Sequence, residues 1–578
     1  MNKKKQNFES GICRIRNLLL FYLNEVSNHL FVCLVVFVIA GICLGHIGYD
    51  FLPGLYAVFL IPIFLFYLSV VFNVHKKSFL LILFTAILFS VFGNFLFVHY
   101  TQKDLCKKEI VALFENNKVT GITGVVTGDS VWNKINAEKE VIKQTFPFKV
   151  ESATFKNGTI VDVKGKINVV WLTGAYDRDN MPFYGDRIQL GGLYCNTKFI
   201  SRGVDKYILK VSSRSWKSEI LEHGVLSSGL LMPLHKYKSF CFRLRKETLP
   251  VFDLGLENFP NVSGVLKSII IGRRVFLNSE FKQGLISTGT IHIIAVSGLH
   301  AGIVAGIIIM VLKLFGCPRY RWFYILAPIL ITYTLYTGAR PSAIRACLML
   351  LIYYLSYVIN RKSNILSTVA ISAFIILVAN PIELFDLGFI FSFATVLGLI
   401  LLFPPVYEII TTDKKIDEND FIPAPHEDKS FKKKLVSFVA VIFVVSLVAW
   451  IVSMPLTIHF FNRVVFIAPV VNVFVVPLTF CLILLGVVTL SSACILSFLP
   501  YIFNKISVLV VKLLEYIIYT ASGFKYGKVE NVDLHNYEFL FYIPLIAIVF
   551  YYKVMKIQRV AREQQRVQKK EFERENFD

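Results

Sequence analysis

The stretch GLISTGTIHIIAVSGLHAGIVAGIIIM, residues 284–310, is apolar and long enough to cross a bilayer. Its middle carries three polar side chains and a glycine: His292, Ser297, Gly298 and His300. Polar groups at that depth are costly unless they line water or meet a partner, so they indicate a functional site. Gly298, Gly302 and Gly306 recur four residues apart, a spacing that lets another backbone approach closely or lets the helix break around a cavity. We expect this stretch to form one wall of a polar site.

The composition is that of a polytopic membrane protein. Of the 578 residues, 55% are hydrophobic and the mean hydropathy is +0.60, whereas soluble domains average about 45–50% apolar residues. The formal net charge is +22. Two explanations fit this charge, because membrane proteins collect Lys and Arg in cytoplasmic loops and nucleic acids attract basic surfaces. We attribute most of the charge to membrane topology.

The ten cysteines form no metal or redox motif. Most lie in apolar runs, where cysteine behaves as a small hydrophobic residue. No CxxC pair and no Cys/His ligand spacing occurs, which argues against structural zinc. Cys106 and Cys195 flank a polar insert and could form a disulfide if that insert lies outside the cytoplasm.

Residues 1–100 are predicted to hold a cytoplasmic start and three membrane spans. The first residues are basic, and the spans are expected at His29–Ile47, Leu52–Val74 and Ser78–His99. The basic cluster His75–Lys77 separates the second span from the third. Because basic loops stay in the cytoplasm, the chain that follows the third span is predicted to lie outside.

Residues 101–215 have the pattern of a small β domain. Short runs alternate between apolar and polar residues, as in Phe146–Val150 and Ile167–Trp171, and turn sequences such as Lys156–Gly158 separate them. About five strands of this length suit a small barrel like the OB fold, whose open face often binds single strands.

The insert also carries aromatic and basic side chains with two interpretations each. The aromatic residues either stack on bases or fill the core of a small barrel, and core packing is the favoured interpretation for any one of Trp132, Phe146, Phe148, Trp171 and Phe183. The lysines either follow phosphates or are ordinary solvated residues.

The rest of the chain is divided into three parts. Residues 216–282, including the basic run Leu231–Leu249, are predicted to form amphipathic helices at the membrane surface. Residues 283–556 hold the remaining spans, with a charged cytoplasmic linker at Thr411–Lys434, and residues 557–578 form a basic cytoplasmic tail. The whole is an α-helical polytopic membrane protein of about 10–12 spans with an OB-like insert.

A second polar motif, TGARPSAIRA, occupies residues 337–346. Pro341 suits the first turn of a helix, where its missing N–H is no loss. A helix N-terminus beside the guanidinium groups of Arg340 and Arg345 is a ready anion site, suited to a phosphate backbone. Arg340 also fits an interfacial anchor, whereas Arg345 lies more than a turn deeper and is the stronger candidate.

Two later segments add polar groups to apolar surroundings. In NPIELFDLGFIFSFA, residues 380–394, Asp386 is either a helix N-cap or a partner for a buried Arg. Between residues 454 and 477, Pro455, Pro469 and Pro477 predict broken helices, and Asn472 is expected to face the same interior as His300.

These segments resemble, in order, the motifs of the ComEC-type competence proteins, the membrane channels of natural transformation. HIIAVSGLHAG resembles the family run HLLAISGLH-x-G, and residues 337–346 resemble TG-x-x-PS-x-x-RA. Residues 380–394 resemble NP-x-x-LFDPGFQLSF-x-A, and YGDRIQLGGLY at 184–194 resembles a run of the family's OB domain. In IIIGRR, residues 269–274, Arg273 stands where the family has an acidic residue.

The resemblance implies an inner-membrane channel that passes single-stranded DNA into the cytoplasm. It implies an external OB domain that receives DNA, and partners that supply a separate nuclease, a DNA receptor and a cytoplasmic ATPase motor, besides membrane lipid. The His-x-His-x-Asp-His motif of the family's metallo-β-lactamase-like domain does not occur here, so we expect a form without that domain, with no metal, cofactor or catalytic residue. The expected path residues are His292, Ser297, His300, Arg340, Ser342, Arg345, Asp386 and Asn472.

Two alternatives remain open at this stage. The chain could transport another polyanion, such as a cell-wall or lipid-linked polymer. It could also be an intramembrane hydrolase, with Ser297 as nucleophile and His300 as base, although no Walker A, HExxH or GxSxG motif accompanies them.

Overall fold

The computed structural model describes residues 30–47, 88–98 and 119–552, the last range with gaps of which the longest are 174–183, 223–231 and 411–430. The described chain falls into two compact units. Unit 1 takes its residues from the ranges 1–97, 362–473 and 526–578, and unit 2 from 98–361 and 474–525. The predicted span at Leu52–Val74, the tail and Cys106 lie outside the described residues.

Four described helices are long and apolar enough to cross a membrane, at Pro341–Val358, Leu387–Ile410, Leu435–Phe461 and Ala468–Ala493. Shorter apolar helices occupy Leu88–Val98, Gly298–Leu314 and Ile365–Ala379. Together with a small β domain, they confirm the predicted class, a polytopic helical membrane protein with a β insert.

Unit 1 is built around pairs of apolar helices in close contact. Its elements are α2 (Leu30–Ile47), the helix Leu88–Val98, α11 (Ile365–Ala379), η6 (Pro381–Phe385), α12 (Leu387–Ile410), α13 (Phe431–Phe461), β11 (Arg463–Val465), the first turns of α14 (Ala468–Ala493) and β12 (Lys528–Glu530). In α2, Gly41 lies so close to the carbonyl of Ser90 that a Cβ would come within 2.0 Å of its oxygen. Gly93 lies as close to Val38, and the missing side chains let the two backbones touch.

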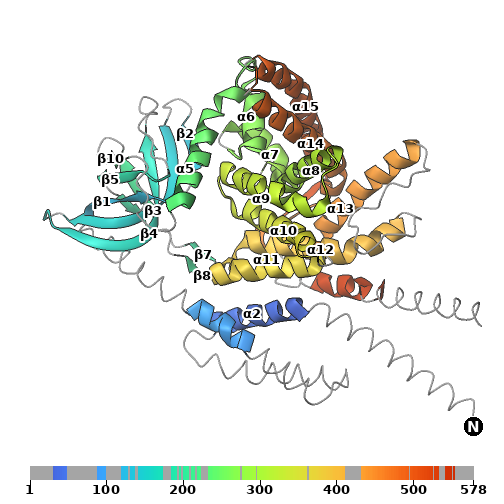
Figure 1. Ribbon diagram of the computed structural model, residues 1–578, viewed down its shortest axis with the longest axis horizontal. Helices are drawn as coiled ribbons and strands as arrows, with labels where there is room; N and C mark the ends of the chain where they lie inside the picture. Colours follow the sequence, from blue (N-terminus) through green and yellow to red (C-terminus); the bar gives the residue numbers. More distant parts are fainter. Residues whose placement is uncertain are drawn as a thin grey trace, which may run out of the picture. The chain divides into compact units, whose positions relative to one another are not determined.

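The β domain of unit 2 begins with an eight-stranded sheet (Figure 1). Its strands are β1 (Val119–Val126), β2 (Val131–Asn136), β3 (Val141–Phe155), β4 (Ile160–Thr173), β5 (Arg187–Gly191), β6 (Tyr194–Asn196), β9 (Lys210–Arg214) and β10 (Ser218–Glu222). β7 (Ile200–Arg202) and β8 (Val204–Lys206) form a separate pair. The strands follow the order β10-β5-β1-β3-β4-β9-β6, with β2 paired to β3, and β4 and β9 pair in parallel. The sheet has more than the five strands expected, and closure into an OB-like barrel stays a prediction.

The alternation of apolar and polar residues in the insert places the apolar side chains on one buried face, as expected. Phe146, Phe148 and Val150 of β3 point into the core, and so do Ile167, Val169 and Trp171 of β4. Because Phe146, Phe148 and Trp171 are at most 2% exposed, they fill the core of the β domain and are not base-stacking platforms. Phe183 lies outside the described residues, as does the side chain of Trp132.

The helices of unit 2 follow the β domain. They are α5 (Met232–Glu247), η3 (Pro250–Phe252), α6 (Pro260–Ile270), α7 (Ser279–Ser287), η5 (Ile291–Ile293), α8 (Gly298–Leu314), α9 (Arg319–Tyr336), α10 (Pro341–Val358), the rest of α14, and α15 (Leu499–Ser522). α9 lies between α8 and α10 in the chain and contacts both, and α8 also contacts α10 (Figure 1). α6 lies inside the unit, with nine of its 11 residues buried.

Two expectations about helix continuity differ from the structure. The stretch 284–310 is not one span, because α7 ends at Ser287 and α8 begins only at Gly298. Pro455 and Pro477 do not break their helices, since each lies inside a continuous helix. The interruption falls between α13 and α14, where β11 pairs with β12 and Pro469 occupies the first turn of α14.

The glycine contact in unit 1 makes a testable prediction. Gly93→Val should destabilise the protein by about 1–3 kcal/mol, because the new side chain has to displace backbone of α2. The matched control is Gly302→Val in α8, where a Cβ meets nothing within 4 Å. Thermal unfolding in detergent micelles should separate the two variants; equal melting temperatures would contradict the close approach.

Candidate functional site

The N-terminus of α8 is closed by its own side chains. Ser297 and His300 form a capping box, in which Ser297 Oγ accepts from the backbone N–H of His300 and the His300 ring accepts from the backbone N–H of Ser297. The ring atom is Nδ1, which lies 3.4 Å from Ser297 N and 3.1 Å from Ser297 Oγ. A serine cap of this kind satisfies N–H groups that have no partner within the helix.

His300 is fully buried, and the other ring nitrogen, Nε2, has no hydrogen-bond partner. Because Nδ1 accepts from Ser297 N–H, the neutral ring carries its proton on Nε2. His300 therefore supplies a buried donor next to the start of α8, which is the kind of group that a polar ligand or water satisfies.

The turn between α9 and α10 is held in an unusual backbone conformation. Gly338 has a φ of 96° and Ala339 a φ of 51°, so two successive residues are left-handed. The N–H of Ala339 donates to Thr334 O at 2.8 Å and closes the end of α9. Arg340 then takes the N-cap position of α10, with Pro341 in the first turn as the sequence predicts.

Three segments of unit 2 meet at this turn. Arg340 Nη2 donates to the carbonyl of Gly272, which follows α6. Ser342 Oγ donates to the carbonyl of Val296 at 2.7 Å, just before α8. Gly272 has a φ of 79°, and a Cβ on it would come within 2.9 Å of Val296 and 3.2 Å of Thr337 O. The segment IIIGRR and the two polar motifs therefore form one site, which we call the motif junction: residues 271–273, 296–300 and 337–345.

Arg345 lies one turn further along α10 and is only 4% exposed. Near it, α8 and α10 approach closely, since a Cβ on Gly298 would lie 3.6 Å from Ala346 Cβ. Gly302 and Gly306, in contrast, face open space, so of the three glycines only Gly298 serves the close approach.

The sequence that contains α8, α9 and α10 carries charges of one sign. Between residues 281 and 382 the sequence contains no Asp or Glu, but eight basic residues: Lys282, Lys313, Arg319, Arg321, Arg340, Arg345, Arg361 and Lys362. α8, α9 and α10 thus bring cations into an apolar environment without an acidic residue of their own. A buried or partly buried guanidinium group at a helix N-terminus favours an anion.

The remaining predicted residues are placed differently. His292 lies in η5 and is exposed, and its Nδ1 is 3.1 Å from Gly289 O. Asp386 caps α12, because its Oδ1 accepts from Gly388 N at 2.9 Å, which confirms the capping interpretation. Asn472 is 8% exposed and its Oδ1 has no partner. Asp386 and Asn472 belong to unit 1. Within unit 2, the structure brings together five of the predicted residues: Ser297, His300, Arg340, Ser342 and Arg345.

Sequence reasoning missed the backbone atoms of the junction. The carbonyls of Gly272 and Val296 receive Arg340 and Ser342, and no side-chain pattern announces them. Gly272 was the available signal, since a glycine between an apolar helix and two arginines fits a left-handed turn. Among the described residues, no group of three or more His, Cys, Asp or Glu side chains could hold a metal ion.

Comparison with known proteins adds independent information. The family described as Competence protein matches residues 269–556, a range that contains the whole motif junction. ComE operon protein 3 of Bacillus subtilis (strain 168) is 27% identical over 237 residues. The match covers 40% of this chain and 27% of that relative, so the chain spans only about a quarter of the relative's length. No solved structure matches.

The motif resemblances at residues 292–302, 337–346 and 380–394 lie inside the family match, and the structure joins the first two of these motifs and the IIIGRR segment in a single site. Through residues 269–556, the chain belongs to the competence protein family.

Proposed function

We propose that this chain forms a membrane channel that passes a single DNA strand into the cytoplasm during natural transformation. The observation that carries the proposal is the motif junction, where Arg340, Ser342 and the capped start of α8 converge beside the buried Arg345 in a segment without acidic residues. A phosphate chain needs fixed positive charge with weak, repeated contacts, so that binding does not stop its passage.

The two ends of helices α8, α9 and α10 carry different residues. The difference supports passage from the junction toward the opposite end. The end opposite the junction carries Arg319 and Arg321, at the start of α9. Trp322 and Tyr354 pack together at that end, 6.3 Å apart, and Tyr357 stacks on Tyr354. Basic loops favour the cytoplasmic side, whereas aromatic belts mark a membrane interface on either side, so we assign that end to the cytoplasm from its arginines and the junction to the opposite face.

This orientation makes Arg340 and Arg345 exceptions that need another reason. Topology accounts for cations on the cytoplasmic side, but not for two arginines at the outer end of α10. An arriving polyanion accounts for both. The β domain, which we also assign to the outer face, would receive the strand through its exposed surface, and both termini would lie in the cytoplasm of a bacterial inner-membrane protein. Asp386 and Asn472, which belong to unit 1, stay predicted path residues.

The proposal requires partners. No Walker A or nuclease motif occurs in the sequence, so a separate nuclease, a DNA receptor and a cytoplasmic ATPase are the expected partners of transport. Transport of another polyanion is the second candidate, because the junction recognises phosphate or carboxylate and does not read bases.

The hydrolase alternative can be tested at Ser297. The capping box already explains its contact with His300. Ser297→Ala should destabilise the protein by about 1 kcal/mol through loss of the cap, whereas Ser297→Asn keeps a capping oxygen and should retain uptake. DNA uptake with matched membrane levels measures this. Loss of uptake in Ser297→Asn with unchanged stability would favour a reacting hydroxyl.

The channel proposal is tested by uptake of labelled DNA into the cytoplasm. Arg345→Ala should lower uptake at least about tenfold because it removes a buried cation from the path, and Arg345→Lys should retain an intermediate level. Arg321→Ala, at an exposed position at the other end of α9, is the matched control and should leave uptake near normal.

The deletion decides between the candidates. Cells without the protein should accumulate DNA outside the inner membrane and none in the cytoplasm. Unchanged cytoplasmic uptake in the deletion would rule out the DNA channel and favour transport of another polyanion.

A further inference from the structure

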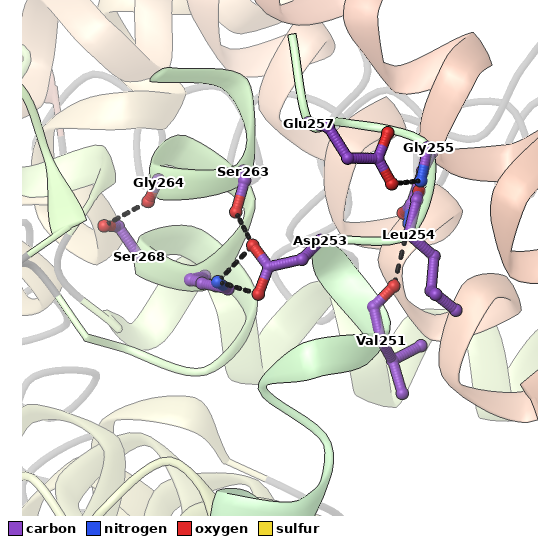
Figure 2. Close-up of polar contacts among 10 residues, drawn as sticks. Val251, Asp253, Leu254, Gly255, Glu257, Ser263, Gly264 and Ser268 are labelled. Atoms are coloured by element: carbon purple, nitrogen blue, oxygen red, sulfur yellow. Dashed lines mark hydrogen bonds and ion pairs between the residues drawn. The ribbon is translucent and has the colours of Figure 1, made fainter. Parts of the chain in front are cut away.

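A second polar cluster lies outside the family match, in the turn before α6. Lys267 is the only charged residue of α6 and is 6% exposed, in a helix of which nine of the 11 residues are buried. Its Nζ lies 2.5 Å and 2.6 Å from the two carboxylate oxygens of Asp253, and Ser263 Oγ donates to the same carboxylate at 2.7 Å. Figure 2 shows the Asp253 carboxylate turned toward Ser263, with its contacts as dashed lines. Asp253 thus fixes α6 at two positions one turn apart.

The turn that carries Asp253 also accepts hydrogen bonds from another helix, α15. Asn504 of α15 is fully buried, and its Nδ2 donates to the carbonyls of Val251 and Leu254 at 2.8 Å and 3.0 Å. The same turn is closed by Glu257, which accepts from Gly255 N at 3.2 Å (Figure 2). α15, the turn and α6 are therefore joined by polar contacts.

The other end of α6 leads directly into the motif junction. The carbonyl of Lys267 accepts from the N–H groups of Ile271 and Arg273, at 3.1 Å and 3.2 Å. Ser268 Oγ lies 2.9 Å from Arg273 O. These bonds shape the turn at Gly272, whose carbonyl receives Arg340. Lys267 thus contacts Asp253 with its side chain and the Gly272 turn with its backbone.

We propose that Asp253 and Lys267 form a positioning pair. By anchoring α6, the pair fixes the position of the Gly272 turn and so holds Arg340 in the motif junction. The inference rests on the proposed function, since it gives the pair a role in the same anion path. The pair acts through the backbone and does not touch the transported strand. A buried lysine in an apolar helix is costly, and a precise anchor for α6 gives it a reason to be there.

The alternative is that the pair only stabilises unit 2. The structure offers a matched control for that effect. Lys512 and Glu515 of α15 form an ion pair at 2.7 Å, again with one side chain at 8% exposure and the other about half exposed. A general loss of stability should follow from Glu515→Gln as well as from Lys267→Met.

Hydrogen exchange of the purified full chain in micelles tests whether the pair holds the Gly272 turn. Lys267→Met and Asp253→Asn should raise the exchange rates of the Ile271 and Arg273 amides at least about tenfold. Asp253→Glu should restore slow exchange, and Glu515→Gln should leave these amides unchanged. Unchanged exchange in Lys267→Met, or an equal rise in Glu515→Gln, would overturn the proposal.

A double-mutant cycle tests the link to Arg340. DNA uptake is measured for Lys267→Met, Arg340→Ala and the double variant at matched membrane levels. If Lys267 acts through Arg340, the double variant falls no further than Arg340→Ala, whereas multiplied losses would overturn the link. Where deletion of the whole protein leaves uptake unchanged, the DNA proposal fails, and the exchange experiment still decides whether the pair holds the turn.

Discussion

A helix that begins inside an apolar environment has to find partners for its free backbone groups within the protein. The motif junction depends on this constraint. α8 starts after a break of ten residues, and the chain satisfies that start with Ser297 and His300. The carbonyls left over by the neighbouring turns, at Val296 and Gly272, accept from Ser342 and Arg340 of α10. The residues that define the motifs are therefore the residues that let a new helix start at this point of the chain.

The same arrangement gives the site its electrostatic character. Satisfying carbonyl groups with arginine and serine brings positive charge and hydroxyl groups to the start of α10, in a stretch of sequence, 281–382, that contains no Asp or Glu. Helix N-termini add to this potential. An anionic ligand is the natural counterpart, and a polymer of phosphates could pass such a site by exchanging one group for the next. The side chains that satisfy the backbone carbonyls are therefore also the side chains that would bind an anion.

Much of the fold was accessible from the sequence, for particular reasons. Alternation in Phe146–Val150 and Ile167–Trp171 predicted buried faces of strands. An N-cap was one of the two interpretations of Asp386, and the structure shows that cap. The break at 288–297 was not predicted as such, because its apolar residues look like those of a continuous span. Pro455 and Pro477 led to the opposite error, because a break was predicted where each helix is continuous. Proline is tolerated inside a span where neighbouring helices supply partners for the freed backbone groups. The buried α6 and its Lys267 were also missed, because a lysine in a short mixed segment resembles a surface helix.

The central claim, that the transported strand passes the motif junction, is tested most directly by photo-crosslinking during DNA uptake. A photoreactive residue replaces Leu299, which is 38% exposed beside His300, and in a second strain Met310, which is 63% exposed in the last turns of the same helix. Incoming labelled DNA should crosslink to position 299, at the motif junction. Crosslinking at 310 alone, or at neither position while DNA still enters the cytoplasm, would contradict the claim.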